Sequence, residues 1–356
     1  MSLHFSWFTP TNGDGARIGL PKPEREPSLN YIVNVAKMAE HVGFDGILIP
    51  VGTPFLDSWM VGSAVVHHTS RIRPLIAIRP GFIAPSLSAK MAATLDRFSG
   101  GRIDINIVTG GSPHELGQDG DFLPHDERYE RTKDFMGVLQ TLWNDQHVDY
   151  EGPYFSLKDA QLVPSSIQPR IPAFFGGASE QGKEAAAQYG DVYLQWGEDV
   201  EEVGKQIEDV RAKAAKYGRT LEYGIRIHVI VRETEREAWE AAERLVADID
   251  PAVEQRMSSY YREADSVAQQ RMSRLLQGDY RFGKHKWAGI GRVRKGAGTA
   301  VVGNPEQVRE GLQEYIDIGV THFILSGFPH LEEAQRVGQL LLPQFKDRRT
   351  GSVSYA

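Results

Sequence analysis

The feature that most constrains this fold is an alternation of short apolar runs with longer amphipathic segments. The run at residues 46–50 (GILIP) has no polar side chain and residues 103–108 (IDINIV) are mostly apolar, which is typical of strands buried in a parallel sheet. Such strands are predicted at residues 4–9, 46–50, 73–78, 103–108, 173–175, 192–196, 223–231 and 321–325. Eight parallel strands with helices between them predict a single (β/α)8 TIM barrel.

The segments between these strands have apolar residues at helical spacing, and several end at glycine, as helices commonly do. We expect helices at residues 29–42, 59–67, 86–98, 127–143, 180–189, 200–217, 235–247 and 305–318. Since no linker interrupts this rhythm, we predict one domain over residues 1–356, with a polar tail at 346–356.

Three stretches break the pattern, at residues 110–125, 144–172 and 248–300, and we expect them to be loop-rich insertions. The last one is basic near its end, where Arg292, Arg294 and Lys295 are interleaved with glycines. Long glycine-rich loops in compact domains commonly act as lids over a site. We therefore predict a mobile Gly/Arg-rich lid before the last strand.

Composition removes several classes of function. A formal net charge of −7 argues against a general nucleic-acid-binding protein. The chain has no cysteine, which excludes disulfides, thiolate nucleophiles and cysteine-ligated metals. Neither His67–His68 nor His114–Glu115 has further ligands at metal-binding spacing, so we predict no metal site. With no signal peptide and no run of ~18 apolar residues, we expect a cytoplasmic protein without a membrane anchor.

Candidate functional residues stand where the predicted strands end, because TIM-barrel active sites lie at that edge. Residues 176–179 (GGAS) precede a helix and suit a phosphate, although Ser179 as a plain helix cap is the alternative. Arg226 and His228 alternate on one strand and so share a face, either as an anion site or as a salt-bridged structural pair. Trp196 is either a wall for a flat ligand or a core residue.

The order and spacing of longer motifs carry a resemblance to a known family. ATLDRFSGGRIDINIVTGG, FFGGASE, GIRIHVIVRET, WAGIGRVRKGAGTAVVG and ILSGFPHLEEA are among the strings concerned, which extend from about residue 3 to about residue 343. The chain resembles the bacterial alkanesulfonate monooxygenases, in the bacterial-luciferase-like group. This resemblance implies a luciferase-type TIM barrel that uses O2 and reduced FMN, supplied by a separate NAD(P)H-dependent FMN reductase. It further implies cleavage of an organosulfonate C–S bond to an aldehyde and sulfite, by a homodimer or homotetramer.

The resemblance also implies roles for single residues on the flavin side. The FMN phosphate would lie at Gly177 and Ser179, with Tyr129 reaching it. Asn106 and Thr109 would line the flavin. At Ser179 the resemblance and the helix-terminus argument point to the same chemistry.

On the substrate side, the resemblance implies that Trp196, Arg226, His228 and Arg294 form the sulfonate pocket and carry catalysis. A sulfonate is a permanent monoanion, and two guanidiniums offer it rigid hydrogen-bonding forks. Since Arg294 lies in the predicted lid, binding of the negatively charged substrate would draw the lid closed and exclude water from the site. His228 would hydrogen-bond the reacting groups or handle a proton.

The main departure from the family is Phe328, which replaces a tyrosine in the family's SGYPHLEEA and which we count among the substrate-binding residues. Phenylalanine cannot donate the tyrosine's hydrogen bond. A sulfosugar such as sulfoquinovose is therefore an alternative substrate, since related sulfosugar monooxygenases use a similar Trp, Arg, His and Arg set. An oxidoreductase using coenzyme F420 or another anionic substrate, and a binding barrel without catalysis, are the other functions left open.

Overall fold

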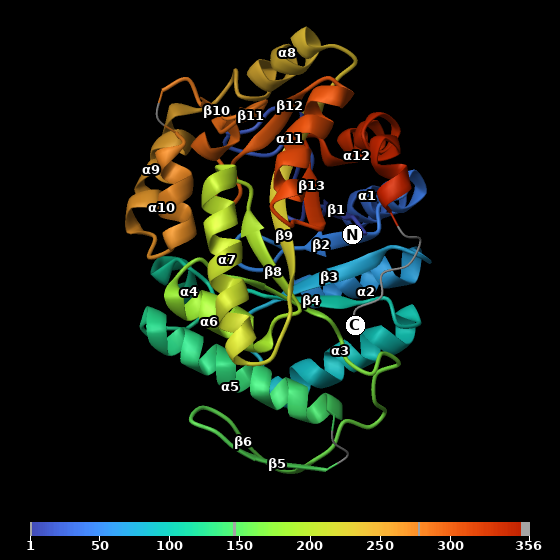
Figure 1. Cartoon of the computed structure of the whole chain (residues 1–356), viewed down its shortest axis with the longest axis vertical. Coiled ribbons are helices and arrows are strands. Elements are labelled where there is room, and N and C mark those ends of the chain that lie inside the picture. The colour runs from blue at the N-terminus through green and yellow to red at the C-terminus, as the bar shows by residue number, and fades with distance from the viewer. Residues whose placement is uncertain (1, 145–146, 277, 350–356) are drawn as a thin grey trace.

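The computed structural model describes residues 2–144, 147–276 and 278–349, and its centre is a closed barrel of eight parallel strands (Figure 1). Each strand pairs with the next, and β13 closes the ring onto β1. In order around the barrel, the strands are β1 (His4–Phe8), β2 (Gly46–Ile49), β3 (Arg73–Ile78), β4 (Asp104–Ile107), β7 (Ala173–Gly176), β8 (Val192–Trp196), β9 (Glu222–Val231) and β13 (His322–Ser326). The predicted barrel is confirmed, and every predicted strand end lies within one residue of the observed end.

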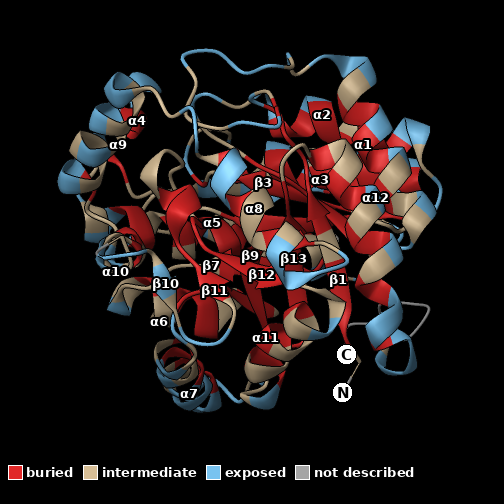
Figure 2. Ribbon diagram, turned by 90° about the horizontal axis from the view of Figure 1, so that it is seen from above, coloured by how far each residue is buried: buried red, intermediate tan, exposed pale blue. Residues whose placement is uncertain are grey.

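Helices surround the barrel, and Figure 2 shows buried residues concentrated in the strands and on the inner helix faces. These helices are α1 (Leu29–Val42), α2 (Ser58–His68), α3 (Pro85–Ser99), α5 (His125–Asn144), α6 (Glu180–Tyr189), α7 (Val200–Lys216), α8 (Glu235–Leu245), α11 (Pro305–Asp317) and α12 (His330–Leu340). Helix α12 was not among the predicted helices. The others agree with prediction to within two residues at each end.

Local chemistry sets the ends of these helices. At the start of α1, the Ser28 side chain accepts a hydrogen bond from the Tyr31 amide. The helix ends at Gly43, whose φ of 95° is the left-handed conformation that glycine adopts without strain. Helix α6 begins at Ser179, whose side chain accepts from the Gly182 amide. The predicted ends of both helices are the observed ends because these capping residues stand in the sequence.

The three insertions contain more regular structure than predicted, so the expectation that they are loops was wrong in part. The first contains α4 (Pro113–Gln118), and the second contains the hairpin of β5 (Val148–Glu151) and β6 (Ser156–Ala160). The third contains α9 (Pro251–Glu263), α10 (Val267–Arg274), β10 (Arg281–Phe282), β11 (Lys286–Trp287) and the 3-10 turn η1 (Gly289–Arg292). The strands among them have only two to five residues, too few for a clear alternating pattern in the sequence.

A further strand, β12 (Ala300–Gly303), was missed altogether. It pairs in parallel with the last residues of β9, from His228 to Val231, outside the closed ring. We call residues 289–299, which lead into it, the lid segment. Gly289, Ile290 and Ala297 of this segment are buried. The mobility of the segment stays a prediction.

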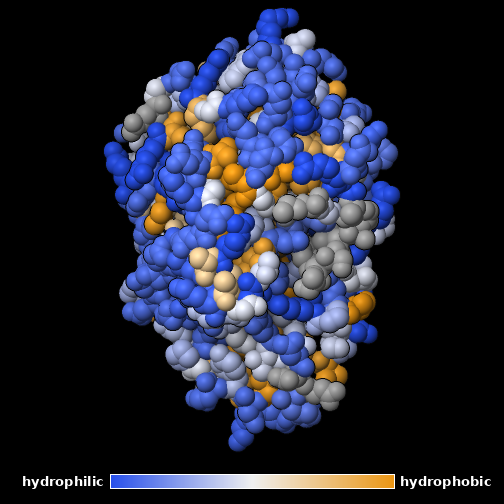
Figure 3. Space-filling model, viewed as in Figure 1, coloured by the Kyte–Doolittle hydropathy of each residue, from blue (hydrophilic) through white to orange (hydrophobic). Residues whose placement is uncertain are grey.

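The surface and the chain end add two findings. Within the described ranges, no helix has both the length and the apolarity to cross a membrane, and the face in Figure 3 is mostly hydrophilic. Of the predicted tail, residues 346–348 belong to the 3-10 helix η2 (Leu342–Arg348). There the Leu3 amide donates to the Arg348 carbonyl at 2.8 Å, and Arg349 pairs with Asp45 at 3.0 Å. Residues 350–356 lie outside the described residues.

Candidate active site

A cavity of about 300 Å³ opens at the carboxyl ends of the barrel strands. Its wall combines strand ends, the loops that follow them, α10 and the lid segment. Eight of the ten predicted site residues line it: Asn106, Thr109, Tyr129, Gly177, Ser179, Trp196, Arg226 and Arg294. The fold therefore brings these eight residues to one place, although they are up to 188 positions apart in the sequence.

One end of the cavity is built for close approach of a small anion. The loop after β7 passes so near α6 that a Cβ on Gly177 would lie 3.0 Å from the Gly182 Cα and 3.1 Å from the Tyr129 hydroxyl. Tyr129 is buried and hydrogen-bonds the Ser179 side chain, and burial raises the pKa of its phenol. The neutral hydroxyl, the serine and the amide groups at the start of α6 converge, which is the donor set a phosphate requires.

The middle of the cavity carries buried polar atoms without partners. Asn106 Oδ1 and both amide atoms of Gln195 have no hydrogen-bond partner among the described residues. Buried polar groups are normally paired, so unpaired ones that line a cavity point to a ligand with matching donors and acceptors. The edge of an isoalloxazine ring offers both kinds. Thr109 is different, because its hydroxyl lies 3.2 Å from that of Thr132. With the phosphate cradle, these groups fit FMN.

The other end of the cavity holds two guanidinium groups against one aromatic ring. Arg226 Cζ lies 4.0 Å from the centre of the Phe8 ring and Arg294 Cζ lies 5.2 Å from it. Arg226 is only 6 % exposed, and its Nε and Nη2 have no partner among the described residues. Arg294 donates to the backbone carbonyls of Lys295 and Ala297, at 3.1 and 3.3 Å.

Burying two positive charges side by side destabilises the fold unless an anion binds between them. Burial lowers the pKa of Arg226 well below its usual range, and the charge of Arg294 lowers it further. Burial also lowers the pKa of Arg294 to about 10. Within the described part of the chain, neither guanidinium forms an ion pair with a carboxylate. The alternative of a salt-bridged structural pair is therefore not supported at Arg226.

Trp196 lines the cavity near Arg294, since a Cβ added at Gly296 would meet both side chains. It is half-buried at the end of β8, and its ring comes close to the lid segment at Gly296, whose added Cβ would lie 3.7 Å from Trp196 Cζ2. The φ of 86° at Gly296 places it in the left-handed region, where glycine is favoured. The tryptophan therefore forms part of the wall where the lid segment meets the barrel.

His228 and Phe328, the remaining two predicted residues, do not line this cavity but a second one. Their rings stack, with centres 5.4 Å apart. His228 Nε2 donates to the Ala297 carbonyl at 3.1 Å, and the Ser326 hydroxyl donates to Nδ1 at 2.9 Å. Burial, followed by the charges of the two arginines, lowers the pKa of His228 well below its usual value. The imidazole is therefore neutral here, with both nitrogens engaged.

The prediction missed a bridge across the cavity mouth. Lys295 Nζ donates to the Thr53 carbonyl at 2.5 Å and to Glu115 Oε2 at 2.9 Å. Glu115 Oε1 in turn accepts from Arg79 Nη2 at 2.6 Å. Burial alone would raise the pKa of Glu115, but Arg79 and Lys295 outweigh it and the pKa is lowered. The bridge ties the lid segment to the loops after β2 and β4.

Some of the missed residues carried a visible signal. Gln195 is a polar residue inside the otherwise apolar run VYLQW, and such a residue is typical of a site. Phe8 and the Lys295–Glu115 pair carried none, because their role depends on which strands and loops become neighbours. In the described ranges, no group of three or more His, Asp or Glu side chains is placed to hold a metal ion.

Comparisons with known proteins agree with this architecture. The EDTA monooxygenase from Chelativorans sp. BNC1 has 20% identity and a TM-score of 0.80, covering 100% of this chain and 96% of that one. A riboflavin lyase, solved with modified FMN and riboflavin, has 21% identity and a TM-score of 0.79 over 100% and 94%. A coenzyme F420-dependent tetrahydromethanopterin reductase from Methanopyrus kandleri has 21% identity and a TM-score of 0.71 over 97% and 100%.

At these identities the likeness to solved structures shows the fold. Membership of a family comes from the sequence match, because the model of the luciferase-like monooxygenase family matches residues 3–322, most of the chain. The barrel, the cavity at its carboxyl edge and this match agree, and the chain belongs to the luciferase-like monooxygenase family.

Proposed function

We propose that this protein is a monooxygenase that uses reduced FMN and O2 to cleave the C–S bond of an organosulfonate, releasing sulfite and an aldehyde. The observation that carries the proposal is the pair of guanidiniums over Phe8. Among the described residues, two buried nitrogens of Arg226 have no partner and Arg294 donates to backbone carbonyls alone. A sulfonate brings three acceptor oxygens and a charge that persists at every working pH.

The residues at the cavity's other end would hold the cofactor. Ser179, Tyr129 and the start of α6 would bind the FMN phosphate, while Asn106 and Gln195 would meet the ring edge. When bound, reduced FMN supplies the electrons that activate O2. The cavity thereby has separate places for the cofactor and for an anionic substrate.

The protein's own contribution to the reaction would be positioning, charge and exclusion of water. Arg226 and Arg294 would orient the sulfonate and stabilise the negative charge of the departing sulfite. Trp196 and Gly296 would close the wall beside it. Lys295 would hold the lid segment down through Glu115. A closed, dry site strengthens the arginine–anion interaction and limits side reactions.

The role of His228 follows from its neutral state. Since Ala297 and Ser326 occupy both ring nitrogens, His228 would move a proton only after the lid segment shifts Ala297 away. With the lid segment in place, the imidazole instead fixes the Ala297 carbonyl, which also accepts a hydrogen bond from Arg294. We therefore assign His228 first to positioning the lid segment and second to proton transfer.

The proposed partners follow from the chemistry. A diffusible reduced flavin requires an NAD(P)H-dependent FMN reductase, and the cytoplasm is the compartment we propose for both proteins. A homodimer or homotetramer is the proposed assembly. Sedimentation of the full chain measures the assembly directly.

The test is sulfite release in a coupled reaction. The protein, a flavin reductase, NADH, FMN and O2 would be mixed with sulfonates from methanesulfonate to octanesulfonate and with a sulfosugar. We expect sulfite from the alkanesulfonates, and none when O2 or FMN is omitted. Sulfite only from the sulfosugar would identify the alternative substrate. No sulfite from any sulfonate, with reduced FMN still bound, would overturn the proposal.

A further inference from the structure

Helix α9 of the long insertion contacts the lid segment, although none of the helix's own residues is buried. The Tyr261 hydroxyl donates to the backbone carbonyls of Gly291 and Arg294, the latter at 2.9 Å. Glu254, two helical turns earlier on the same face of α9, accepts a hydrogen bond from Arg292 Nε at 2.7 Å. Two side chains of α9 therefore contact the stretch of backbone that carries Arg294.

The lid segment is closed at its base, so one further contact can fix its shape. The Gly291 amide donates to the Gly298 carbonyl at 3.0 Å. The two glycines approach so closely that a Cβ on Gly298 would lie 2.5 Å from the Gly291 Cα. Arg294 stands near the middle of the loop between them. Because Tyr261 contacts one carbonyl at the base of this loop and one at its middle, the hydroxyl fixes the position of Arg294 relative to the base.

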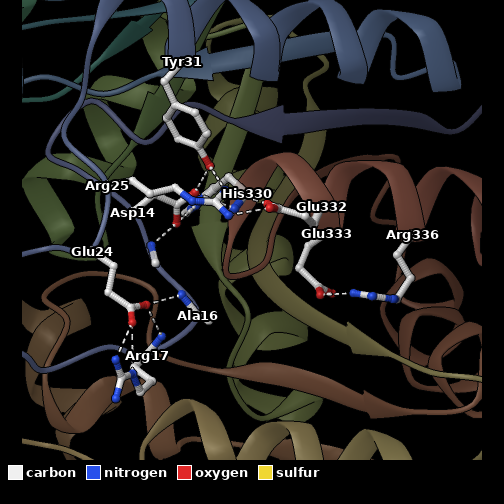
Figure 4. A network of polar contacts seen from close by, with 11 residues as sticks. Asp14, Ala16, Arg17, Glu24, Arg25, Tyr31, His330, Glu332, Glu333 and Arg336 are labelled. Atoms are coloured by element: carbon white, nitrogen blue, oxygen red, sulfur yellow. Dashed lines mark hydrogen bonds and ion pairs between the residues drawn. The ribbon is translucent and has the colours of Figure 1, made fainter.

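Arg294 has to be held through its backbone if its guanidinium is to stay available for an anion. Arginines that line the second cavity are held by carboxylates instead. Figure 4 shows two such pairs, Arg25 with Glu332 at 2.5 Å and Arg17 with Glu24 at 2.7 Å. A carboxylate on Arg294 would occupy the donors that a sulfonate needs. A hydroxyl that binds the backbone carbonyl leaves those donors free.

Arg294 also has to be held against repulsion. Its guanidinium lies over the same Phe8 ring as that of Arg226. Burial and then the charge of Arg294 lower the pKa of Arg226, so the two cations disfavour each other. Burial raises the pKa of the Tyr261 phenol, against the lowering effect of Arg294. The phenol therefore stays neutral and stabilises the lid segment without adding a charge to the site.

We propose that Tyr261 is a positioning residue for Arg294, and that its hydroxyl keeps this guanidinium beside Arg226 before the anion binds. The inference rests on the proposed function, because it concerns the anion site which that function requires. Tyr261 does not itself line the cavity, so it acts through the lid segment. Holding a binding group in place beforehand raises affinity, since less order has to be imposed on binding.

The first test asks whether the lid segment loosens when the hydroxyl alone is removed. Hydrogen exchange of the full chain without any ligand would be followed by mass spectrometry in peptides that cover residues 289–299. We expect these amides to exchange about fivefold faster in Tyr261→Phe, the usual weight of one hydrogen bond. Tyr217→Phe is the matched control, because its hydroxyl contacts Glu184 outside both cavity linings. Unchanged exchange in Tyr261→Phe would overturn the inference.

The second test is a double-mutant cycle, which asks whether Tyr261 acts through Arg294. Calorimetry with oxidised FMN would measure the binding of 1-octanesulfonate to the wild type, Tyr261→Phe, Arg294→Met and the double variant. We expect Tyr261→Phe to raise Kd about fivefold in the wild type and to leave Kd unchanged in the Arg294→Met background. Thermal unfolding verifies that each variant is folded. An equal loss of affinity in both backgrounds would overturn the inference.

The combined results separate this inference from the proposed function. Faster exchange of the lid segment in Tyr261→Phe, without sulfite release from any sulfonate in the coupled reaction, would leave the inference standing and overturn the proposed function. Sulfite release, with a lid segment that exchanges equally in the wild type and Tyr261→Phe, would do the reverse. Neither sulfite release nor faster exchange would overturn both.

Discussion

Two arginines on barrel strands, the partly buried Arg73 and the buried Arg226, show how differently the two ends of the barrel are built. Arg73 opens β3 at the closed end, where its guanidinium donates to Asp104 at 2.6 and 3.2 Å, to Gln168 at 3.0 Å and to two backbone carbonyls. Arg226 on β9 faces Phe8 and the cavity, and two of its nitrogens have no partner in the part of the chain that the structure describes. The closed end uses its arginine for stability, and the mouth keeps its arginine available for a ligand.

Replacing Arg226 is the strongest test of this contrast. We expect Arg226→Met to lower kcat/KM for sulfite release by about 100-fold or more, because an oriented charge is lost at the reacting group. The melting temperature should stay constant or rise, since a buried charge without a partner is removed. Sulfite kinetics and thermal unfolding measure the two effects. Near-normal turnover in this variant would remove Arg226 from the site.

Replacing Arg73 should give the opposite result. Arg73→Met leaves Asp104, which is 4 % exposed, as a buried charge without its main partner. Breaking such a pair costs about 3–5 kcal/mol of unfolding free energy. Denaturant unfolding measures this cost, and the folded fraction should keep its kcat/KM. A stable Arg73→Met protein with impaired turnover would contradict the division between the two ends.

The barrel itself could be predicted from the sequence because its signals are local. Segments such as 73–78 and 192–196 are nearly continuous apolar runs, and both were placed to the residue. Ser28, Gly43 and Ser179 fixed helix ends through side-chain and backbone capping, which depends only on neighbours in the chain.

What escaped prediction depends on long-range pairing. The run AVVG at residues 300–303 is a strand only because it finds the exposed edge of β9. The length of β9 was predicted to within one residue, but the sequence could not show that its last residues pass the cavity and pair with β12. His228 therefore lies beyond the first cavity although it shares a face with Arg226. Eight of the ten predicted site residues line one cavity, their roles stay predictions, and the position of His228 and Phe328 at a second cavity was not foreseen.

The bridge at the cavity mouth allows a further test of the contrast between paired and unpaired cations, with a smaller expected effect. Unlike Arg226, Lys295 at the mouth has a carboxylate partner. Lys295→Met removes the contacts to Glu115 and Thr53. The side chain is 26 % exposed, so the loss should be about 1 kcal/mol, or roughly fivefold in KM for the sulfonate. Steady-state kinetics measure it, and Lys295→Arg should restore most of the effect. An unchanged KM would mean that the bridge does not hold the lid segment.

Lowering the pH should destabilise the fold slightly through His4 at the closed end of the barrel, and this is the smallest of the predicted effects. His4 stacks on His322, with ring centres 4.7 Å apart, and burial and then His322 lower the pKa of His4, against the raising effects of Asp45 and Glu222. The His4 imidazole therefore binds a proton more readily in the unfolded chain than in the folded protein. The contribution of neutral His4 to stability is complete above pH 6.5 and falls as the pH drops below this value. His4→Gln should reduce this acid-side fall in melting temperature by a few degrees at most. Identical profiles for both proteins would exclude His4 as its source.

The pairing of β12 with β9 has a consequence for how the whole insertion is attached. The chain leaves β9 after Val231 and returns beside the same strand, where the Arg232 amide donates to the Gly303 carbonyl and the His228 amide to the Thr299 carbonyl. Residues 232–299 therefore begin and end within a few residues of each other on one rigid strand. Segments with such closely spaced ends can be exchanged without rebuilding the scaffold that carries them. The region that bears Arg294, Lys295 and one wall of each cavity is thus attached as a module, whose exchange would leave the other barrel strands in place.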